Sequence, residues 1–305
     1  MAEPPSDMFV KQAQFTKTVY RDVYPTIDPT NPANSMAGKI IVITGPSKGL
    51  GRIAFVKAFA KAGPKAIVLV SRNETGLGEV RHEIHAINKD VQVEIIPTDI
   101  KNAESVTSFW EKVKEKFGHA DVLINNAASV GGGTVSEQPI DSWWNDFSGT
   151  NILKETNVRG TFIVTQGFLK LLGKERKGAI INLTTFAAHM PFPGLSSYSI
   201  SKLALTQLQA FVAVECPNVT AVAVHPGLIL TDATLDYFKP FAKDSPELLG
   251  GLGVWLATEK AAFLSGKYVE VNWSVDELME RKEEIVKEGK LSIGIKGEFG
   301  SEQFK

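Results

Sequence analysis

The sequence predicts an α/β protein built on one parallel β-sheet with helices on both faces. Between residues 40 and 271, about seven short apolar runs recur, and several lack the polar alternation of a half-exposed strand. Helical patterns of apolar residues separate several of these runs. Because β-α-β units make right-handed crossovers, the repeat predicts a doubly wound sheet between two helix layers.

The predicted elements can be placed in order along the chain. The strands cover residues 40–44, 66–70, 91–96, 122–125, 179–183, 219–224 and 268–271. Two helices are marked by apolar residues three and four positions apart, which are Leu77, Val80, Ile84 and Ile87 in one and Val106, Phe109 or Trp110, Val113 and Phe117 in the other. Asn102 is a candidate N-cap of the second helix.

Two terminal segments flank the predicted α/β domain, which covers residues 39–275. Residues 1–38 are predicted to form an arm, because prolines interrupt them repeatedly. The aromatic side chains of the arm indicate that it lies on a surface of its own chain or of a partner subunit; they are Phe9, Phe15, Tyr20 and Tyr24. Residues 276–305 are predicted to form a C-terminal extension, with a charged helical segment over 277–288 and a glycine-rich tail.

Charge and cysteine content exclude several classes of protein. The chain of 305 residues carries 33 Lys and Arg against 34 Asp and Glu, so no positive field favours nucleic acid or an anionic membrane. No apolar run reaches the ~18 residues of a transmembrane helix, and residues 1–38 lack the apolar core of a secretory signal. The single cysteine, Cys216, excludes an intramolecular disulfide and a cysteine-rich zinc site. We therefore expect no metal and a reducing compartment, the cytoplasm.

A glycine-rich turn, Thr44-Gly-Pro-Ser-Lys-Gly-Leu-Gly51, joins the first strand to a helical pattern over 52–62. Gly45 permits the sharp turn, while Gly49 and Gly51 remove side chains that would block phosphates or separate helix from strand. Backbone amides and the helix dipole would face an anion here, which predicts a pyrophosphate site; the alternative is a turn that binds nothing. The expected contacts are Gly45, Ser47, Lys48, Gly49, Leu50 and Gly51.

A tyrosine and a lysine lie one helical turn apart in Tyr198-Ser-Ile-Ser-Lys202. At this spacing both side chains share one helix face, so the Lys202 ammonium can lower the pKa of the Tyr198 phenol from its free value of ~10. A phenol tuned in this way can exchange a proton with a substrate oxygen near neutral pH. The alternative is a surface tyrosine beside a solvated lysine.

Taken together, these motifs resemble the short-chain dehydrogenase/reductase family, from about residue 38 to about residue 273. Asn125-Asn-Ala-Ala128 matches the family's Asn-Asn-Ala-Gly motif, with Ala128 in place of the glycine. The resemblance implies a single Rossmann-type fold, a nicotinamide cofactor, and Asn157, Tyr198 and Lys202 as catalytic residues, the last two also touching the cofactor. Further cofactor contacts implied by the resemblance are Asp99, Asn126, Ala127, Pro226, Gly227 and Thr231.

The residues after the second strand favour NADP(H) over NAD(H). NAD-selective sites place an acid there to bind the ribose hydroxyls, but this chain has Ser71 and Arg72. Arg72 can pair with a 2′-phosphate, and Asn73 can add a polar contact. Lys48 stands where basic residues accompany NADP preference in the family. The alternative is an arginine that merely ends a strand at the surface.

A third catalytic group should bind the substrate oxygen. Thr185 lies thirteen residues before Tyr198, where the family typically has serine. Threonine keeps the hydroxyl but adds a methyl group and a stiffer χ1, and Thr184 is the nearby alternative. Asn157 is expected to act through its backbone, holding a water that continues the proton path beyond Lys202; it could instead merely bend a helix.

Aromatic residues gather where the family binds its substrate. The loop after Thr185 supplies Phe186, His189 and Phe192 as candidate substrate contacts, and His189 is expected to serve as polar lining. A second group follows Gly227, where a mobile lid is expected, and comprises Tyr237, Phe238 and Phe241. These rings predict a bulky or aromatic carbonyl compound or the matching alcohol as substrate, or else they are core or subunit contacts.

The resulting functional prediction is an NADP(H)-dependent oxidoreductase that interconverts a ketone and a secondary alcohol. Alternatives on the same fold are imine or enoyl reduction, epimerisation through a transient ketone, and a catalytically silent NADP-binding regulator. The resemblance also implies a homodimer or homotetramer built through the helices that contain Asn157 and Tyr198. The long arm and residues 269–276 resemble poorly characterised fungal members, and the interval between Trp144 and Asn157 predicts an insertion.

Overall fold

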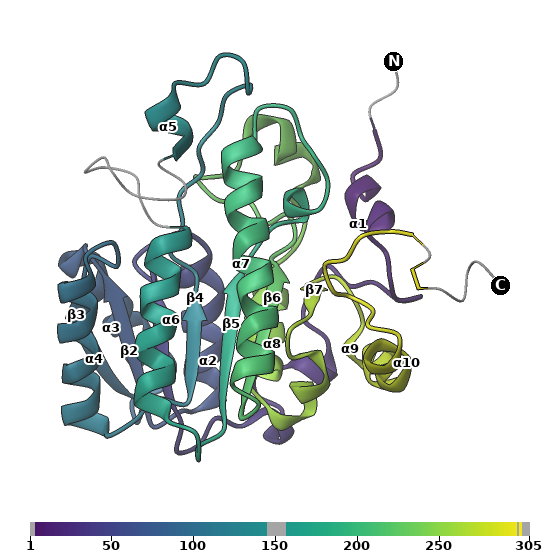
Figure 1. Cartoon of the computed structure of the whole chain (residues 1–305). Coiled ribbons are helices and arrows are strands. Elements are labelled where there is room, and N and C mark those ends of the chain that lie inside the picture. Colours follow the sequence, from purple (N-terminus) through teal and green to yellow (C-terminus); the bar gives the residue numbers. More distant parts are fainter. Residues whose placement is uncertain (1–3, 145–156, 298, 301–305) are drawn as a thin grey trace.

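A computed structural model describes residues 4–144, 157–297 and 299–300, and the predicted insertion between Trp144 and Asn157 lies outside them. One parallel seven-stranded sheet forms the centre, in the order β3-β2-β1-β4-β5-β6-β7 (Figure 1). The strands are β1 (Ile40–Thr44), β2 (Ala66–Ser71), β3 (Gln92–Pro97), β4 (Val122–Asn125), β5 (Gly178–Leu183), β6 (Val219–His225) and β7 (Tyr268–Glu270). The predicted doubly wound parallel sheet is confirmed.

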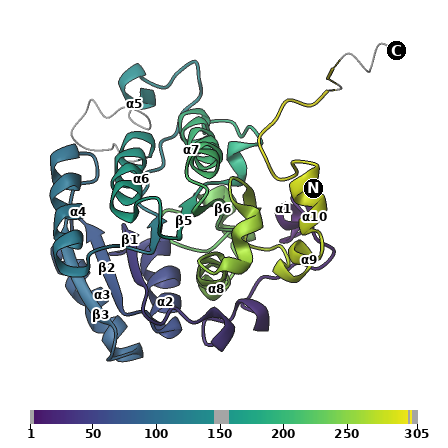
Figure 2. The same cartoon turned by 60° about the horizontal axis from the view of Figure 1, so that its bottom comes forward.

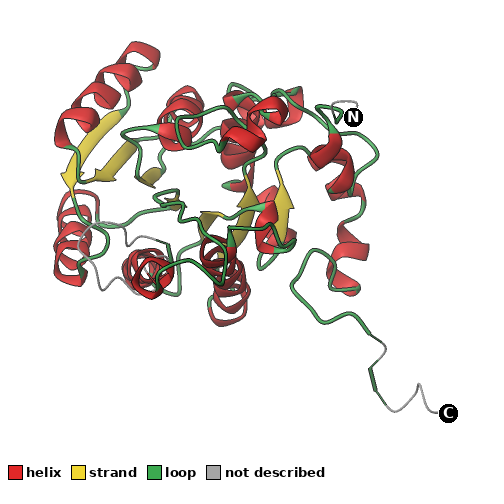
Figure 3. Cartoon of the chain, turned by 90° about the horizontal axis from the view of Figure 1, so that it is seen from above, coloured by secondary structure: helices red, strands yellow, loops and turns green. Residues whose placement is uncertain are grey.

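Helices cover both faces of the sheet, as the view from above shows (Figure 3). One face carries α2 (Lys57–Ala62), α3 (Glu74–Ile87) and α8 (Pro246–Leu256), and the other carries α4 (Ala103–Phe117), α6 (Val158–Leu172) and α7 (Ser196–Glu215). Shorter helices lie outside these layers: α1 (Met8–Gln12), α5 (Ile140–Trp144), α9 (Val275–Glu280) and α10 (Lys282–Lys287). Short 3₁₀-helices are η1 (Pro25–Ile27), η2 (Pro32–Asn34), η4 (Phe186–Ala188), η5 (Asp236–Phe241) and η6 (Glu259–Leu264), while η3 (Gly51–Val56) is π-helical and continues into α2. No helix in the described part of the chain is both long and apolar enough to cross a membrane.

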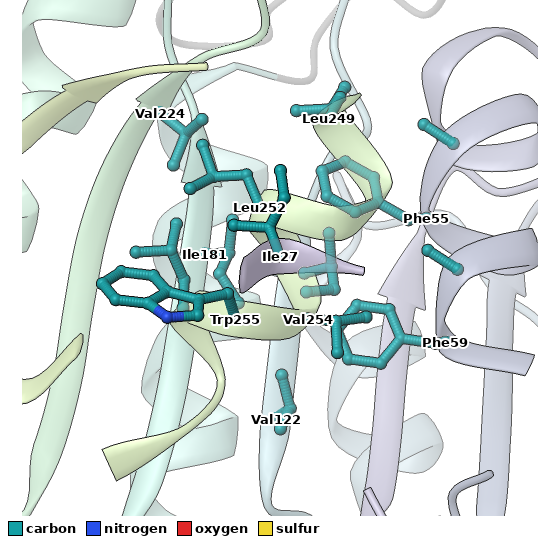
Figure 4. Close-up of a cluster of buried hydrophobic side chains, with 14 of the residues drawn as sticks. Ile27, Phe55, Phe59, Val122, Ile181, Val224, Leu249, Leu252, Val254 and Trp255 are labelled. Carbon is teal, nitrogen blue, oxygen red and sulfur yellow. The ribbon is translucent and has the colours of Figure 1, made fainter. Parts of the chain in front are cut away.

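The larger of two apolar clusters lies between the sheet and α8. Phe55, Phe59 and Trp255 are fully buried there against side chains of the central strands (Figure 4). Two glycines of α8 let it approach closely, since a Cβ on Gly250 would lie 2.6 Å from the Cβ of Ala58 and one on Gly253 would lie 2.6 Å from the Phe55 ring. Close packing against α8 therefore holds η3 and α2, the helical segment that follows the glycine-rich turn.

Asn102 caps the start of α4, as the sequence predicted, while the predicted C-terminal helical segment is divided into α9 and α10. The Asn102 side chain accepts a hydrogen bond from the Ser105 amide at 2.9 Å, as expected of an N-cap. The predicted helical segment over 277–288 consists of two short helices, because the helix is interrupted at Arg281. The Arg281 guanidinium lies 3.8 Å from the centre of the Phe15 ring and donates to the Phe15 carbonyl, so a contact with the arm accompanies the break.

Residues 4–24 run along the β7 side of the molecule, where Figures 1 and 2 both place α1 near the C-terminal helices. Residues 25–38 continue to the end of α2, where the Met36 amide donates to the Ala62 carbonyl at 2.9 Å. Tyr20 and Asn272 are joined by two hydrogen bonds, from the Tyr20 amide to the Asn272 carbonyl and from the Asn272 side chain back to the Tyr20 carbonyl. Tyr24, Ile27 and Met36 are buried in the larger apolar cluster. The arm is therefore packed against its own chain, at the β7 edge of the sheet and beside α8 and α2.

Candidate active site

A cavity of about 850 Å³ opens at the carboxyl ends of the strands, where ligands bind in open α/β sheets. It is bordered by segments that follow β1 to β6 and by part of the arm. Most of the predicted site residues line it: Gly45, Ser47, Lys48, Gly49, Leu50, Arg72, Asp99, Asn126, Ala127, Thr185, Phe186, Phe192, Tyr198, Lys202, Pro226, Gly227 and Thr231. Three predicted residues do not line it, and these are Gly51, Asn157 and His189.

The glycine-rich turn has the close packing that its composition predicted. Gly45 and Gly49 have φ angles of +66° and +56°, which favour glycine. A Cβ on Gly51 would lie 2.6 Å from the Gly45 carbonyl oxygen, so Gly51 serves helix packing rather than contact with a ligand. The Asn126 side chain donates to the Thr44 and Gly45 carbonyls at 2.9 and 3.0 Å, which holds the turn against the end of β4.

The end of β2 borders the same cavity and carries positive charge. Lys48 and Arg72 are exposed and line the cavity, and neither forms an ion pair within residues 4–144, 157–297 and 299–300. The Asn73 side chain accepts from the Gly76 amide and caps α3. The turn and these two cations could receive phosphate groups of a dinucleotide.

Tyr198 and Lys202 lie on the first turns of α7 and line the cavity together. The Lys202 side chain is 3% exposed, and its Nζ donates to the Leu183 carbonyl at the end of β5 at 2.8 Å. The same Nζ lies 5.9 Å from the centre of the Tyr198 ring. A buried ammonium at this position favours the phenolate form of the tyrosine.

Thr185 and Thr184 differ in what their hydroxyls already bind. Thr184 is buried, and its Oγ1 bonds to the Lys202 carbonyl at 3.2 Å and to Thr206 Oγ1 at 2.9 Å. Thr185 is half-buried in the cavity wall, and its Oγ1 accepts from the Ala187 amide at 3.2 Å. Because accepting that bond leaves the hydroxyl hydrogen available, Thr185 is the better placed of the two to donate to a substrate oxygen.

Asn157 lies behind the cavity and connects two of its walls. Its side chain exchanges hydrogen bonds with the backbone of Ser129 after β4, and it donates to Ser201 Oγ on α7 at 3.1 Å. Ser201 Oγ in turn donates to the Tyr198 carbonyl at 2.7 Å. The role expected of the Asn157 backbone stays a prediction, while its side chain joins the segment after β4 to α7.

The aromatic residues predicted on the substrate side divide into two groups. Phe186, Phe192 and Phe238 line the cavity. His189 is exposed, and its ring packs edge-on against Tyr268 with centroids 4.3 Å apart. Tyr237, which is 63% exposed, lies outside the cavity lining.

Polar residues of β6, β7 and the adjacent loops also line the cavity, and sequence analysis did not single them out. His225 and Glu270 are paired across the two strands and are buried. Burial lowers the pKa of His225 to about 3, and its Nδ1 accepts from the Phe186 amide at 3.2 Å. The pKa of Glu270 is raised to about 8, chiefly by burial; the hydrogen bond from the Tyr268 hydroxyl lowers this pKa, and the nearby charge of Asp244 raises it. Glu270 lies in the otherwise apolar run 268–271, and a glutamate in a buried strand is the sequence feature that could have indicated this part of the cavity wall.

The described residues contain no group of three or more His, Cys, Asp or Glu side chains that could hold a metal ion.

Comparison with known proteins agrees with the geometry of the cavity. The model of a family described as short chain dehydrogenase matches residues 39–240. The chain belongs to this family. A short chain dehydrogenase of Monascus purpureus is 35% identical over 304 residues, covering 97% of this chain and 99% of its own. A short chain dehydrogenase of Monascus ruber is 35% identical over 291 residues, covering 91% and 92%.

Solved structures of short chain dehydrogenases share the fold. The L-sorbose reductase of Gluconobacter frateurii, solved with NADPH and L-sorbose, has a TM-score of 0.68 at 27% identity and covers 79% of this chain and 97% of its own. A dehydrogenase/reductase of Sinorhizobium meliloti has a TM-score of 0.69 at 26% identity, covering 78% and 95%. The protein is therefore an oxidoreductase of the short chain dehydrogenase family that resembles fungal members.

Proposed function

We propose that this protein is an NADP(H)-dependent enzyme that interconverts a ketone and a secondary alcohol. The observation that carries the proposal is one cavity with the glycine-rich turn on one wall and Tyr198, Lys202 and Thr185 on another. A cofactor held at the turn and a carbonyl group held at Thr185 would both lie within that space. The family relationship supports the reaction class.

The residues present would hold the cofactor along the cavity. The glycine-rich turn would receive the pyrophosphate, Arg72 and Lys48 the 2′-phosphate, and the loop from Pro226 to Thr231 the nicotinamide end. When bound, NADPH supplies a hydride to the carbonyl carbon, and NADP⁺ accepts one in the reverse direction. The NADPH complex of the L-sorbose reductase is consistent with this preference.

The protein's own groups manage the proton. In ketone reduction, Tyr198 Oη donates its proton to the carbonyl oxygen, and the Lys202 ammonium stabilises the phenolate that remains. Thr185 Oγ1 donates a hydrogen bond to the same oxygen, where negative charge develops. Asn157 fixes the helix that carries Tyr198 through Ser201. Alcohol oxidation runs through the same groups in reverse.

The phenylalanines in the cavity wall support a carbonyl substrate with a bulky or aromatic group. The proposed reaction involves no nucleic acid, membrane or metal. The cytoplasmic location, which was inferred from the single cysteine, stays a prediction.

We further propose that the protein forms a homodimer or homotetramer, because exposed apolar side chains lie on α6 and α7.

A screen of ketones with NADPH and of secondary alcohols with NADP⁺ tests the function, with Tyr198→Phe as matched control. We expect wild-type turnover of at least one bulky ketone, and a fall of roughly 10²-fold or more in kcat for the variant while NADPH still binds. Product analysis separates ketone reduction from imine or enoyl reduction and epimerisation. Tyr198→Phe with wild-type kcat in single-turnover experiments would refute the proposed mechanism.

A further inference from the structure

Helix α1 of the N-terminal arm forms part of the cavity wall, although it lies far from every catalytic residue in the sequence. Phe9 and Val10 line the cavity together with Phe192 and Phe238. The Phe9 ring centroid lies 6.0 Å from that of Phe192, 5.6 Å from that of Phe238 and 4.9 Å from that of Phe241. Three segments, the arm, the loop after β5 and η5 after β6, therefore meet in one cluster of rings.

One buried carboxylate ties the arm to the loops that border the cavity. Asp244 accepts from Arg21 Nε at 2.7 Å, from the Leu228 amide at 2.6 Å and from the Asn272 side chain at 2.9 Å. Arg21 also donates to the Phe241 carbonyl at 2.9 Å, and its own carbonyl accepts from the Ser245 amide at 2.8 Å. The base of the arm and the segment that carries Phe238 and Phe241 are thus held as one unit.

Helix α1 itself is attached mainly through apolar contacts. It is five residues long, and within it Val10 is the buried residue. The ion pair between Lys11 and Asp7 is local and exposed. Gln12 Nε2 donates to Met190 Sδ at 3.2 Å at the surface. Phe9 makes ring contacts with Phe192 and Phe238, which line the cavity, and with the buried Phe241, so its ring links α1 to the cavity wall.

We propose that Phe9 is a specificity-determining residue. The arm supplies the outer wall of the substrate cavity, and its phenylalanine covers a bulky aromatic group of the substrate while the reacting carbonyl lies at Thr185 and Tyr198. The family model begins at residue 39, so this wall comes from a part of the chain outside the shared family domain. The position of the reacting carbonyl group rests on the proposed function, whereas the position of the bulky aromatic group rests on the cluster of rings around Phe9.

Two ketones of different size test the inference: 2-acetylnaphthalene and 2-butanone, each with NADPH. For Phe9→Ala we expect KM for 2-acetylnaphthalene to rise roughly tenfold, while kcat/KM for 2-butanone stays within about twofold of wild type. Phe9→Leu should be intermediate, since it keeps apolar bulk but loses the ring. The matched control is Phe15→Ala, because Phe15 belongs to the same arm but packs on Trp273 and Arg281 and does not line the cavity.

Calorimetric binding of 2-acetylnaphthalene to the NADP⁺ complex separates this inference from the proposed function. If the wild type reduces no ketone of the screen, the proposed function fails, whereas a roughly tenfold weaker Kd for 2-acetylnaphthalene in Phe9→Ala still supports the wall. Thermal unfolding and NADPH affinity, both expected near wild type, exclude a folding defect. Equal effects of Phe9→Ala on both ketones, equal effects of Phe15→Ala, or no naphthyl binding by the wild type would each overturn the proposal.

Discussion

At the scale of single residues, Arg72 offers the most direct test of cofactor preference. Its guanidinium is exposed at the end of β2 and borders the cavity. Replacing it with alanine removes a charge-assisted contact to a phosphate, which should cost roughly 1.5–3 kcal/mol, or ~10- to 100-fold in NADPH affinity. NADH lacks the phosphate, so its affinity should not change. Titration of both cofactors checks this, and equal affinities for both in the wild type would rule out the NADP assignment.

Thr185 can be tested by two substitutions, one that removes its hydroxyl group and one that removes its methyl group. Thr185→Val keeps the shape but cannot donate, so kcat should fall by ~10²–10³, or roughly 3–4 kcal/mol of transition-state stabilisation. Thr185→Ser keeps the donor and should retain activity, with more room for bulky ketones. NADPH affinity should stay unchanged in both. If the valine variant matches the wild type in single-turnover kinetics, the substrate oxygen is bound by another group.

Glu270 should make stability depend on pH. Its folded-state pKa is about 8 against an ordinary 4.5, chiefly because of burial. Between these values the folded protein keeps a proton that the unfolded chain has lost, so its contribution to stability is present below pH 4.5 and is lost as pH rises toward 8. Glu270→Gln removes this titration and retains an acceptor for the Tyr268 hydroxyl. The variant should therefore gain stability relative to wild type across this window, by up to a few kcal/mol at about 1.4 kcal/mol per pKa unit.

Denaturant unfolding from pH 5 to 8.5 measures the difference between the two pH profiles. Titration of His225 is common to both proteins and cancels in the difference. Glu283→Gln, on the exposed side of α10, controls for the loss of one acidic side chain. Parallel profiles for Glu270→Gln and wild type would contradict a raised pKa for Glu270.

At the scale of elements, the junction of β1 with its helix depends on the absence of one side chain. Gly51→Ala would bring a Cβ within 2.6 Å of both the Gly45 carbonyl oxygen and the Asn126 side chain. We expect a loss of roughly 1–3 kcal/mol in unfolding free energy, as for overpacked cores, together with weaker NADPH binding. Gly78→Ala on α3 is the control, because nothing lies within 4 Å of its Cβ position and alanine favours helix. Equal melting temperatures for the two variants would show that the turn relaxes freely.

At the scale of the whole molecule, α6 and α7 lie side by side (Figure 1), and both helices carry exposed apolar residues. Phe162 on α6 and Ile200, Phe211 and Val214 on α7 are exposed, and the three on α7 share one helix face by their spacing. Burying such a patch between two copies would account for it. We therefore expect a homodimer or homotetramer.

Phe211→Glu should shift the assembly toward the monomer, because it places a charge where the patch would be buried. Sedimentation velocity at micromolar concentration measures this shift. Val286→Glu, at a 54% exposed position on α10, is the control and should leave the assembly unchanged. A wild-type protein found only as a 33.2 kDa species would contradict the expected oligomer.

The sequence by itself determined the features that depend on local spacing. A helical turn places Tyr198 and Lys202 on one face of a helix, and Gly45 and Gly49 allow the sharp turn between a strand and a helix. The alternation of apolar runs and helical patterns likewise determined a parallel sheet, because its strands are buried on both faces.

Only the tertiary structure decided which distant segments meet. Phe9 and Phe241 are separated by more than two hundred residues, and their contact leaves no periodic pattern in either segment. The same is true of the Asn157–Ser201 bridge, the pairing of His225 with Glu270, and the position of His189 outside the cavity. These contacts arise from packing between elements, which spacing along one element cannot specify.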